Sequence, residues 1–239
     1  MIDLSVVVPI FNEEENIKGL VYEISQSLKD INFEIVVVDD DSSDKSLQVL
    51  QKIRKTNVRL RIIKHSRNYG QSFAVRSGIK YSKSEWIATL DGDGQNDPND
   101  IPKLYEALLK ESIGTKNILI AGHRVKRKDS WLKIVSSKYA NKLRSRILKD
   151  EVPDTGCGLK LFSRDFFLDL PSFNHMHRYI PALFISHGGK VLSIEVNHRP
   201  RVKGTSKYGF NNRFWVGIKD ILGVRWLQKR SQEIISKEV

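Results

Sequence analysis

The sequence has a single cysteine, Cys157, among its 239 residues. One thiol cannot form an internal disulfide, which excludes the small secreted domains that depend on a disulfide framework. Residues 1–5 show neither the basic segment nor the long apolar stretch of a secretory signal. No apolar run approaches the roughly 18 residues that a membrane-spanning helix needs. These absences predict a cytosolic protein that does not cross a membrane on its own.

Internal repeats and low-complexity linkers are also lacking, so the composition does not divide the chain into several units. A chain of 239 residues is long enough to bury the core of one large α/β domain. We expect a catalytic domain over residues 1–209, followed by an amphipathic helix and tail over residues 210–239.

The sequence carries an excess of positive charge. Forty Lys and Arg against 28 Asp and Glu give a formal net charge of +12. This excess implies an anionic partner, and nucleic acid, nucleotide phosphates or acidic lipid would each satisfy it. Ten basic side chains lie between Arg124 and Lys149, interleaved with apolar residues at near-helical spacing. The segment predicts a basic amphipathic helix, suited either to a solvated helix face or to contact with a membrane surface.

Short apolar runs alternate with segments of helical period along the chain. This order predicts an α/β fold with a mostly parallel sheet flanked by helices on both faces, and ligands at the carboxyl ends of the strands. After residue 150 the alternation weakens. The predicted strands are residues 4–9, 33–38, 60–63, 86–90, 118–121, 159–162 and 191–196, and the predicted helices are residues 13–28, 43–55, 71–81, 100–110, 178–186 and 211–230.

An acidic motif follows the fourth predicted strand. Asp91 and Asp93 stand one residue apart and are separated by a glycine, with a second glycine after them. Glycine lets the backbone turn tightly, and paired carboxylates suit an oxygen-ligated divalent cation that would in turn hold phosphate. Asp-Gly pairs are also common turn formers, so a surface turn without ligand fits the same residues. Polar segments expected at the same sheet edge favour the metal interpretation.

Those other segments carry both acids and bases. Asp40 ends the second predicted strand and could accept hydrogen bonds from a base or ribose, whereas Glu13 could bind a ligand or only favour the start of its helix. Arg124 follows the fifth predicted strand. Arg201 and Lys207 belong to a glycine-hinged loop that suits a diphosphate, although a solvated basic loop is the ordinary alternative.

The histidines and the cysteine predict no chemistry by themselves. His175, His177 and His187 lack a compelling metal-ligand spacing, so structural or surface roles are expected for them. Cys157 has no base assigned to it, so nucleophilic catalysis by this thiol is not expected. The candidate site therefore depends on carboxylates and on Lys and Arg side chains.

Together these residues resemble the inverting family 2 glycosyltransferases of the GT-A fold, specifically the polyprenyl-phosphate hexosyltransferases that include dolichol-phosphate mannose synthase. The resemblance covers nearly the whole chain, including VVVPIFNEEENI at residues 6–17 and RNYGQSFAVRSG at residues 67–78. HMHRYIPAL at residues 175–183 and the loop of residues 201–208 are the parts more particular to lipid-phosphate acceptors. The chain departs from the family pattern at Phe11 for tyrosine, Asp41 for glycine or asparagine, and Lys160 for arginine.

The resemblance also implies roles for individual residues. It implies a nucleotide-sugar donor bound by strand ends and cationic loops, and a Mg or Mn ion held by an acidic motif. The implied metal ligands are Asp91, Asp93 and Gln95, and the implied catalytic residues are Asp93, Arg124, Arg201 and Lys207. The implied donor contacts are Pro9, Phe11, Glu13, Val38, Asp40, Asp91, Gly92, Asp93, Arg124, Arg201 and Lys207.

The reaction that the resemblance implies is transfer of a hexose, mannose or glucose, from GDP-mannose or a UDP-hexose to dolichyl or undecaprenyl phosphate with inversion. A phosphate monoester is substantially ionised at neutral pH, so this nucleophile needs no strong general base. We expect a peripheral protein at the cytoplasmic face of the membrane. Bacterial relatives often continue into transmembrane helices where this sequence stops, which suggests a separate integral membrane partner.

Three other functions fit parts of the sequence. A glycosyltransferase acting on a saccharide or a lipid A type hydroxyl would need an acid near the anomeric carbon to serve as base. A nucleotidyltransferase would be distinguished by pyrophosphate release. A nucleic-acid-binding module would account for the net charge, but the acidic strand ends would repel a phosphate backbone, so no nucleic-acid partner is expected.

Overall fold

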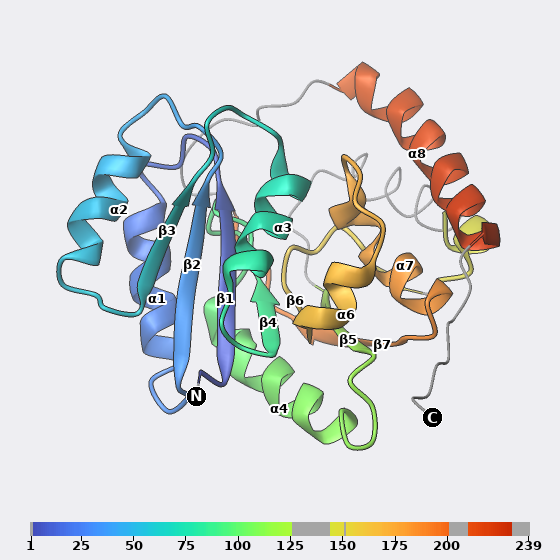
Figure 1. Cartoon of the computed structure of the whole chain (residues 1–239), viewed down its shortest axis with the longest axis horizontal. Helices are drawn as coiled ribbons and strands as arrows, with labels where there is room; N and C mark the ends of the chain where they lie inside the picture. The colour runs from blue at the N-terminus through green and yellow to red at the C-terminus, as the bar shows by residue number, and fades with distance from the viewer. Residues whose placement is uncertain (1, 126–143, 151, 201–209, 231–239) are drawn as a thin grey trace, which may run out of the picture.

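A computed structural model describes residues 2–125, 144–150, 152–200 and 210–230, with backbone alone for residues 210–216. At its centre is a seven-stranded sheet in the order β3-β2-β1-β4-β6-β5-β7 (Figure 1). The strands are β1 (Leu4–Ile10), β2 (Phe33–Asp39), β3 (Leu60–Lys64), β4 (Trp86–Thr89), β5 (Ile118–Arg124), β6 (Lys160–Ser163) and β7 (Lys190–Val196).

The sheet is mostly parallel, as the alternation of elements predicts. β1 pairs in parallel with β2 and β4, β2 with β3, and β5 with β7. β6 is antiparallel to both β4 and β5. Every residue of β1 and β2 is buried, which explains why both strands are mostly apolar and do not alternate apolar with polar residues. The insertion of β6 brings the segment before Lys160 against the carboxyl end of β4.

Helices cover both faces of the sheet (Figure 1). On one face, the core joins the even-numbered residues of β1 to α1, α2 and α4, whose buried side chains include Leu20, Leu50 and Leu104. On the other face, Val7 and Val36 pack with side chains of α3, α6, α7 and α8. The helices are α1 (Ile17–Ser27), α2 (Ser46–Arg54), α3 (Gln71–Tyr81), α4 (Ile101–Glu111), α6 (Arg164–Asp169), α7 (Ile180–Ser186) and α8 (Phe210–Arg230), with short 3₁₀ helices η1 (Pro98–Asp100) and η2 (Met176–Arg178).

The start of α1 differs from the sequence expectation. The helix begins at Ile17, not at residue 13. Asn12 has φ 56°, which turns the chain away from helical geometry. The backbone N–H groups of Glu13 and Glu14 then donate to side chains of the next βα loop, Ser46 at 2.8 Å and Asp44 at 3.1 Å. The two loops at the carboxyl ends of β1 and β2 are therefore tied together by polar contacts that helical periodicity does not predict.

The segment expected to form a basic helix over residues 124–149 is described only at its ends. Arg124 is the last residue of β5, so the expectation was wrong at its start, while residues 144–148 are helical. Residues 126–143 lie outside the described part of the chain. Within the described residues, no helix combines the length and apolarity that crossing a bilayer requires. The division into a catalytic domain over residues 1–209 and a C-terminal helix stays a prediction.

Candidate active site

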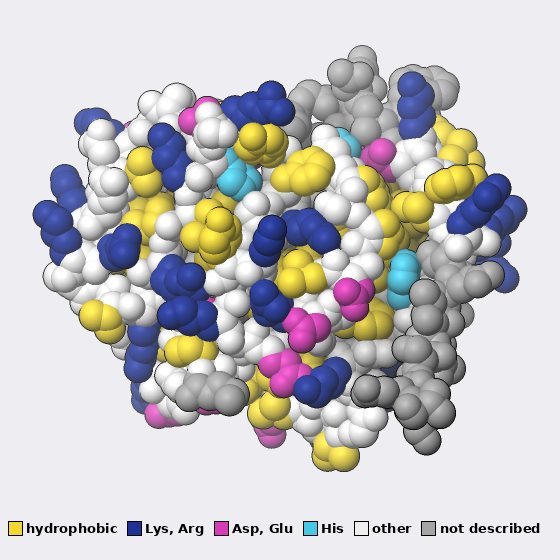
Figure 2. Space-filling view, viewed as in Figure 1, with side chains coloured by type: hydrophobic (Ala, Val, Ile, Leu, Met, Phe, Trp, Pro, Cys, Tyr) yellow, Lys and Arg dark blue, Asp and Glu magenta, His cyan; other side chains and the backbone are white. Residues whose placement is uncertain are grey.

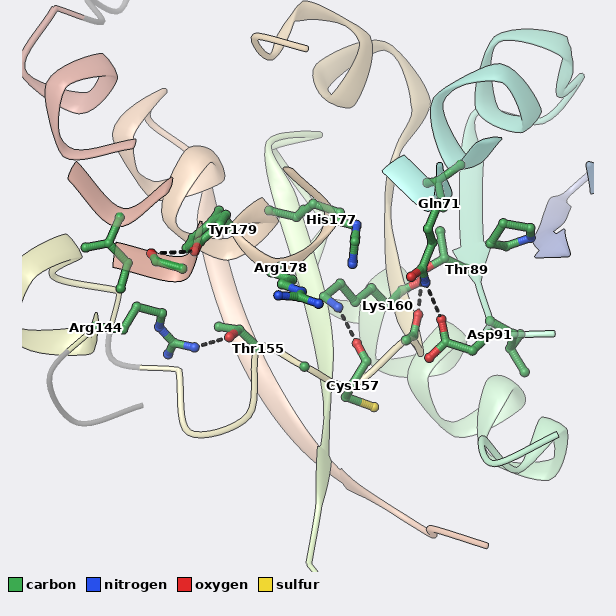
Figure 3. A pocket seen from close by; sticks show the side chains of 18 residues that line it. Gln71, Thr89, Asp91, Arg144, Thr155, Cys157, Lys160, His177, Arg178 and Tyr179 are labelled. Carbon is green, nitrogen blue, oxygen red and sulfur yellow. Dashed lines mark hydrogen bonds between the residues drawn. The ribbon is translucent and has the colours of Figure 1, made fainter. Parts of the chain in front are cut away.

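The carboxyl ends of β1 and β4 open onto a cavity of about 400 Å³ (Figure 3). Its wall is built from the ends of these two strands, the start of α3, residues 155–160, residues 177–180 and one side of α8. Among the described residues that line it, Asp91 is the sole carboxylate, facing three cationic side chains. Those cations are Arg144, Lys160 and Arg178.

Asp91 follows β4 and projects into this cavity (Figure 3). Its Oδ1 accepts a hydrogen bond of 2.7 Å from Nε2 of Gln71, at the start of α3. On its other side lies Gly158, where a Cβ atom would come within 2.3 Å of Asp91 Oδ2. Burial, followed by the charge of Asp93, raises the pKa of Asp91 to about 6, although Lys160 and Arg124 oppose the shift. The site therefore holds a carboxylate whose charge is poorly compensated.

The turn after Asp91 has the features expected of a cation site. A Cβ on Gly92 would lie 2.7 Å from Ile10 Cγ2, so only glycine lets the turn approach the end of β1 this closely. Gly94 has φ +73° and reverses the chain. Asp93 Oδ1 accepts the backbone N–H of Gln95 at 3.1 Å, which places all three implied ligands in one turn.

The donor set fits a divalent cation that is completed by substrate. In the described part of the chain, no cluster of three or more His, Cys, Asp or Glu side chains could enclose a metal ion by itself. Mg²⁺ is ordinarily held by one or two carboxylates plus substrate phosphates, and not by an all-protein cage. The charge of Asp93 raises the pKa of Asp91, and among the described residues no Lys or Arg forms an ion pair with Asp91. Two mutually repelling carboxylates suit such an ion.

Arg124, at the end of β5, is fixed by Asp154. Its Nε and Nη2 donate to the two carboxylate oxygens of Asp154 at 2.6 and 2.8 Å. Burial opposes the positive charge, but the hydrogen bonds and charge of Asp154 raise the pKa of Arg124 overall. The guanidinium lies behind Gly156, where a Cβ would be 3.2 Å from Nη2. Arg124 is thus close enough to act on the charge of Asp91, but the cavity wall in front of it is Gly156.

Lys160 is the residue that sequence reasoning noted only as a departure from the family pattern. Its side chain is buried in the cavity wall, and Nζ donates to the carbonyl oxygen of Cys157 (Figure 3). Burial lowers the pKa of Lys160, while Cys157, Asp91 and Asp154 act in the other direction. Burial also raises the pKa of the Cys157 thiol, which favours its protonated form.

The implied nucleotide contacts lie at the ends of β1 and β2. Pro9 lines the cavity and pairs in register with Val38, which is fully buried. Phe11 is partly buried in the following loop. Glu13 Oε2 accepts a hydrogen bond of 2.7 Å from Asn16 Nδ2, so this carboxylate also stabilises the loop before α1. The structure brings these residues together at one edge of the sheet, next to the turn of Asp91.

Asp40 is buried and already engaged by the chain. Its Oδ1 accepts from His65 Nδ1 at 2.6 Å and from the backbone N–H of Tyr69 at 2.9 Å, and its Oδ2 accepts from the N–H of Gly70 at 2.7 Å. Asp40 therefore anchors the loop that leads directly into Gln71, the partner of Asp91. Sequence reasoning placed Asp40 at this edge but did not predict these contacts.

Three further cavity residues come from the segment around η2. His177 Nδ1 lies 2.7 Å from Ser72 Oγ, and the same Oγ accepts the His177 backbone N–H at 3.3 Å. Burial lowers the pKa of His177 to about 3, so the ring is neutral at pH 7. Arg178 and Tyr179 follow it into the cavity wall. Local spacing gave no sign of these roles, and HMHRYIPAL was singled out by resemblance alone.

Arg201 and Lys207 lie outside the described residues. The chain just before them is held against the acidic turn. The backbone N–H of Arg199 donates to the carbonyl oxygen of Gln95 at 3.0 Å, and the Arg199 guanidinium pairs with Asp97 at 2.6 Å. Residues 198–200 therefore lead into the basic loop from a point beside the proposed metal ligands.

Known proteins resemble this chain in both sequence and fold. The model of the family "Glycosyl transferase family 2" matches residues 5–170. A dodecaprenyl-phosphate galacturonate synthase of Rhizobium johnstonii is 35% identical over 234 residues, covering 95% of this chain and 68% of the relative. An undecaprenyl-phosphate 4-deoxy-4-formamido-L-arabinose transferase of Aeromonas hydrophila is 31% identical over 211 residues, covering 86% of this chain and 63% of the relative. The chain thus spans about two thirds of the length of these relatives.

Solved structures show the same architecture at low sequence identity. A mannosyl-3-phosphoglycerate synthase from Rubrobacter xylanophilus superposes with a TM-score of 0.68 at 14% identity, over 100% of this chain and 78% of that one. A mannosyltransferase from Pyrobaculum calidifontis, solved in complex with GDP-Man and Mn²⁺, gives a TM-score of 0.64 at 19% identity, over 97% of this chain and 65% of that one. The family match over residues 5–170 and the seven-stranded sheet agree, and the chain belongs to glycosyl transferase family 2, with the GT-A fold.

Proposed function

We propose that this glycosyltransferase moves a sugar from a nucleotide-sugar donor to the phosphate of a polyprenyl phosphate, with inversion at the anomeric carbon. The observation that carries the proposal is the cavity between the acidic turn and a cationic wall. Asp91 enters it from β4, while Arg144, Lys160 and Arg178 enter it from later parts of the chain. One side suits a cation and the donor diphosphate, and the other suits an anionic acceptor.

The charges of the cavity favour a phosphate acceptor over a hydroxyl acceptor. A hydroxyl must lose its proton to a base of suitable pKa, whereas a phosphate monoester is already ionised. His177 is a poor base because its pKa is lowered to about 3. Asp91 is the one carboxylate among the described lining residues, and it is a proposed metal ligand. The relatives named above support the same choice, because both names contain a polyprenyl phosphate.

Asp91, Asp93 and Gln95 would hold the divalent cation, Mg²⁺ or Mn²⁺, which supplies positive charge against the departing diphosphate. Arg124 adds a fixed cation behind Gly156, and its pairing with Asp154 keeps it in one orientation. The resemblance implies that Arg201 and Lys207, which lie outside the described residues, bind the same diphosphate. Catalysis then depends on positioning donor and acceptor in line and on stabilising the leaving group.

The sugar and the nucleotide are the finer parts of the proposal. A hexose, mannose or glucose, from GDP-mannose or a UDP-hexose is the expectation from resemblance. The two relatives carry galacturonate and a formamido-arabinose in their names, so the donor panel includes nucleotide-linked uronic acids and amino sugars. We infer that the lipid substrate brings the protein to a membrane surface, at the cytoplasmic face where nucleotide sugars are made.

A transfer assay tests the proposal. Purified protein is incubated with a short polyprenyl phosphate and each of these nucleotide sugars, in the presence of Mg²⁺, Mn²⁺ or a chelator. We expect a lipid-linked sugar phosphate and free nucleoside diphosphate from one donor class, and none with chelator. Asp93→Asn should lower turnover by orders of magnitude while the melting temperature does not fall, because the variant loses the charge that repels Asp91. Transfer to the free polyprenol, or near-normal activity of Asp93→Asn, would contradict the acceptor or the metal, respectively. Pyrophosphate release would instead indicate a nucleotidyltransferase.

A further inference from the structure

Arg178 differs from the other cations of the cavity in having no partner among the described residues. Lys160 Nζ donates to a backbone carbonyl oxygen. Arg144 donates to Thr155 and to the carbonyl oxygen of Val152, and pairs with Asp150. The guanidinium of Arg178 forms neither a hydrogen bond nor an ion pair with any described residue, although it lines the cavity (Figure 3). A partly buried arginine of this kind is a ready binding site for an anion.

The surroundings of Arg178 add a neutral donor. Ser72 Oγ accepts the backbone N–H of His177, so its own hydrogen is available for His177 Nδ1. The ring then carries its hydrogen on Nε2, and a pKa of about 3 keeps it in that neutral form. The Ser72 contact also ties η2 to the start of α3, which fixes the backbone from which Arg178 projects.

One acidic side chain lies near this group on the neighbouring helix. Asp220 of α8 is close enough for Arg178 to lower its pKa, although burial raises that pKa overall. The distance exceeds that of an ion pair, since none joins the two residues. Arg178 is therefore oriented by its surroundings while its guanidinium stays uncommitted.

Apolar side chains also line this cavity. Val75 of α3 and Ile180 of α7 belong to one core cluster with Tyr179, and Ile221 of α8 packs against that cluster; all of them line the cavity that Arg178 lines. A nucleoside diphosphate offers no hydrocarbon to bury against these apolar side chains, whereas a phosphate attached to a hydrocarbon chain does. A cation with adjoining apolar walls thus matches the head and first carbons of a lipid phosphate.

The geometry points to Arg178 as the residue that binds the acceptor phosphate. The ring Nε2–H of His177 is the second donor to this phosphate, and Val75, Ile180 and Ile221 contact the first isoprene unit. The inference rests on the proposed function for the identity of the acceptor. It separates the two phosphate sites of the reaction: the donor diphosphate at the acidic turn and Arg124, and the acceptor phosphate at η2.

Binding of geranylgeranyl phosphate and of geranylgeraniol, followed by calorimetry, tests the site without requiring turnover. We expect the wild-type protein to bind the phosphate at least about tenfold more tightly than the alcohol. Arg178→Gln should lose that preference, and Arg178→Lys should restore part of it. Arg54→Gln, an exposed arginine on α2 at the far side of the sheet, is the matched control and should bind as wild type does. Thermal melts show that each variant is folded.

The arms of the experiment separate the possible failures. If wild-type protein does not prefer the phosphate, or if Arg178→Gln keeps the preference, the acceptor site is wrong. If Arg178→Gln instead weakens binding of GDP or UDP with Mg²⁺, Arg178 serves the donor, and the inference is also overturned. If wild-type protein binds the lipid phosphate through Arg178 but transfers no sugar to it, the site stands and the proposed function fails.

Discussion

The surroundings of Asp91 in the folded protein disfavour the ionised form of its carboxyl group. Burial and the neighbouring Asp93 raise its pKa from an ordinary 3.8 to about 6. Between these two values the folded protein binds more protons than the unfolded chain, so stability falls as pH rises through this window. Well above pH 6 the whole penalty is present, and a shift from 3.8 to about 6 corresponds to about 3 kcal/mol. The ionised Asp91 thus lowers the stability of the metal-free protein, and a bound cation would compensate its charge.

Asp91→Asn should therefore stabilise the metal-free protein while it abolishes transfer. At pH 7 we expect the free energy of unfolding to rise by about 1–3 kcal/mol, or a few degrees in melting temperature, because the amide still accepts from Gln71 without carrying charge. Near pH 4 the difference from wild type should nearly vanish. Thermal melts with chelator at several pH values measure this, with the exposed Asp30→Asn as control. If Asp91→Asn were less stable than wild type at pH 7, the claim that the charge of Asp91 destabilises the folded protein would be wrong.

The pair of Arg124 and Asp154 is buried, with side-chain exposures of 13% and 6%, so its loss should be costly. Asp154→Asn removes the charge that faces the guanidinium, and we expect a loss of about 2–4 kcal/mol of unfolding free energy together with a fall in kcat. Glu85→Gln makes the same kind of change in the exposed pair with Lys116, and should cost less than about 1 kcal/mol. Urea titration compares the two variants. Equal effects would show that burial of the Arg124 pair has no consequence.

At the scale of elements, α3 connects the sheet to the site. Its first residue, Gln71, contacts Asp91, Ser72 contacts His177, and the middle of the helix packs on β1 and β2. The close approach depends on Gly78, where a Cβ would lie 2.4 Å from Val7 Cγ1 and 3.0 Å from Val38 Cγ2. Both contacts are with side chains of buried strands, which have little room to move.

Gly78→Ala should therefore displace α3 and loosen the cavity. We expect a loss of about 1–3 kcal/mol in unfolding free energy, in spite of the higher helix propensity of alanine. Gly19→Ala in α1 is the matched control, because nothing lies within 4 Å of a Cβ there, and it should gain up to about 1 kcal/mol. Urea titration measures both variants. If Gly78→Ala were as stable as wild type, the packing of α3 on the sheet would be less tight than the structure indicates.

At the scale of the molecule, α8 has two apolar sides. Val224 is buried, Ile221 packs with the same core cluster, and Gln228 Nε2 donates to the carbonyl oxygen of Leu148. Leu222 and Trp226, four residues apart on another side, are 61% and 57% exposed. Figure 2 shows Lys and Arg side chains over the visible surface of the molecule, with hydrophobic side chains beside them near α8. An exposed Trp next to basic side chains suits the interface of an anionic membrane.

Replacing both exposed residues, as Leu222→Ser with Trp226→Ser, should weaken binding to anionic vesicles by about tenfold or more, since the apolar contact with the bilayer is lost. The melting temperature should change little, because Val224 and Gln228 still hold the helix on the domain. Val58→Ser with Ile113→Ser alters two other exposed residues, 95% and 84% exposed, and serves as control. Vesicle flotation measures both proteins. Equal binding by the two double variants would remove α8 from the membrane interface.

Periodicity and motif spacing were enough to predict the fold class and the sheet edge at which a ligand site is expected. Periodicity is a local property, so the order of strands and helices was readable, including α3 over residues 71–81. The carboxyl ends of parallel strands share one edge, so Asp40, Asp91 and Arg124 could be placed near one another without coordinates. The acidic motif was visible because its two carboxylates and glycines are adjacent in the chain.

Which side chains meet at that edge, and how their pKa values are shifted, became visible only in the folded chain. Gln71, Lys160 and Arg178 meet because β6 inserts antiparallel beside β4 and η2 docks on α3, and such contacts between distant segments have no local signature. Burial then sets the pKa of Asp91 near 6 and leaves His177 neutral. Desolvation depends on everything packed around a group, so no pattern of neighbouring residues in the sequence could have supplied it.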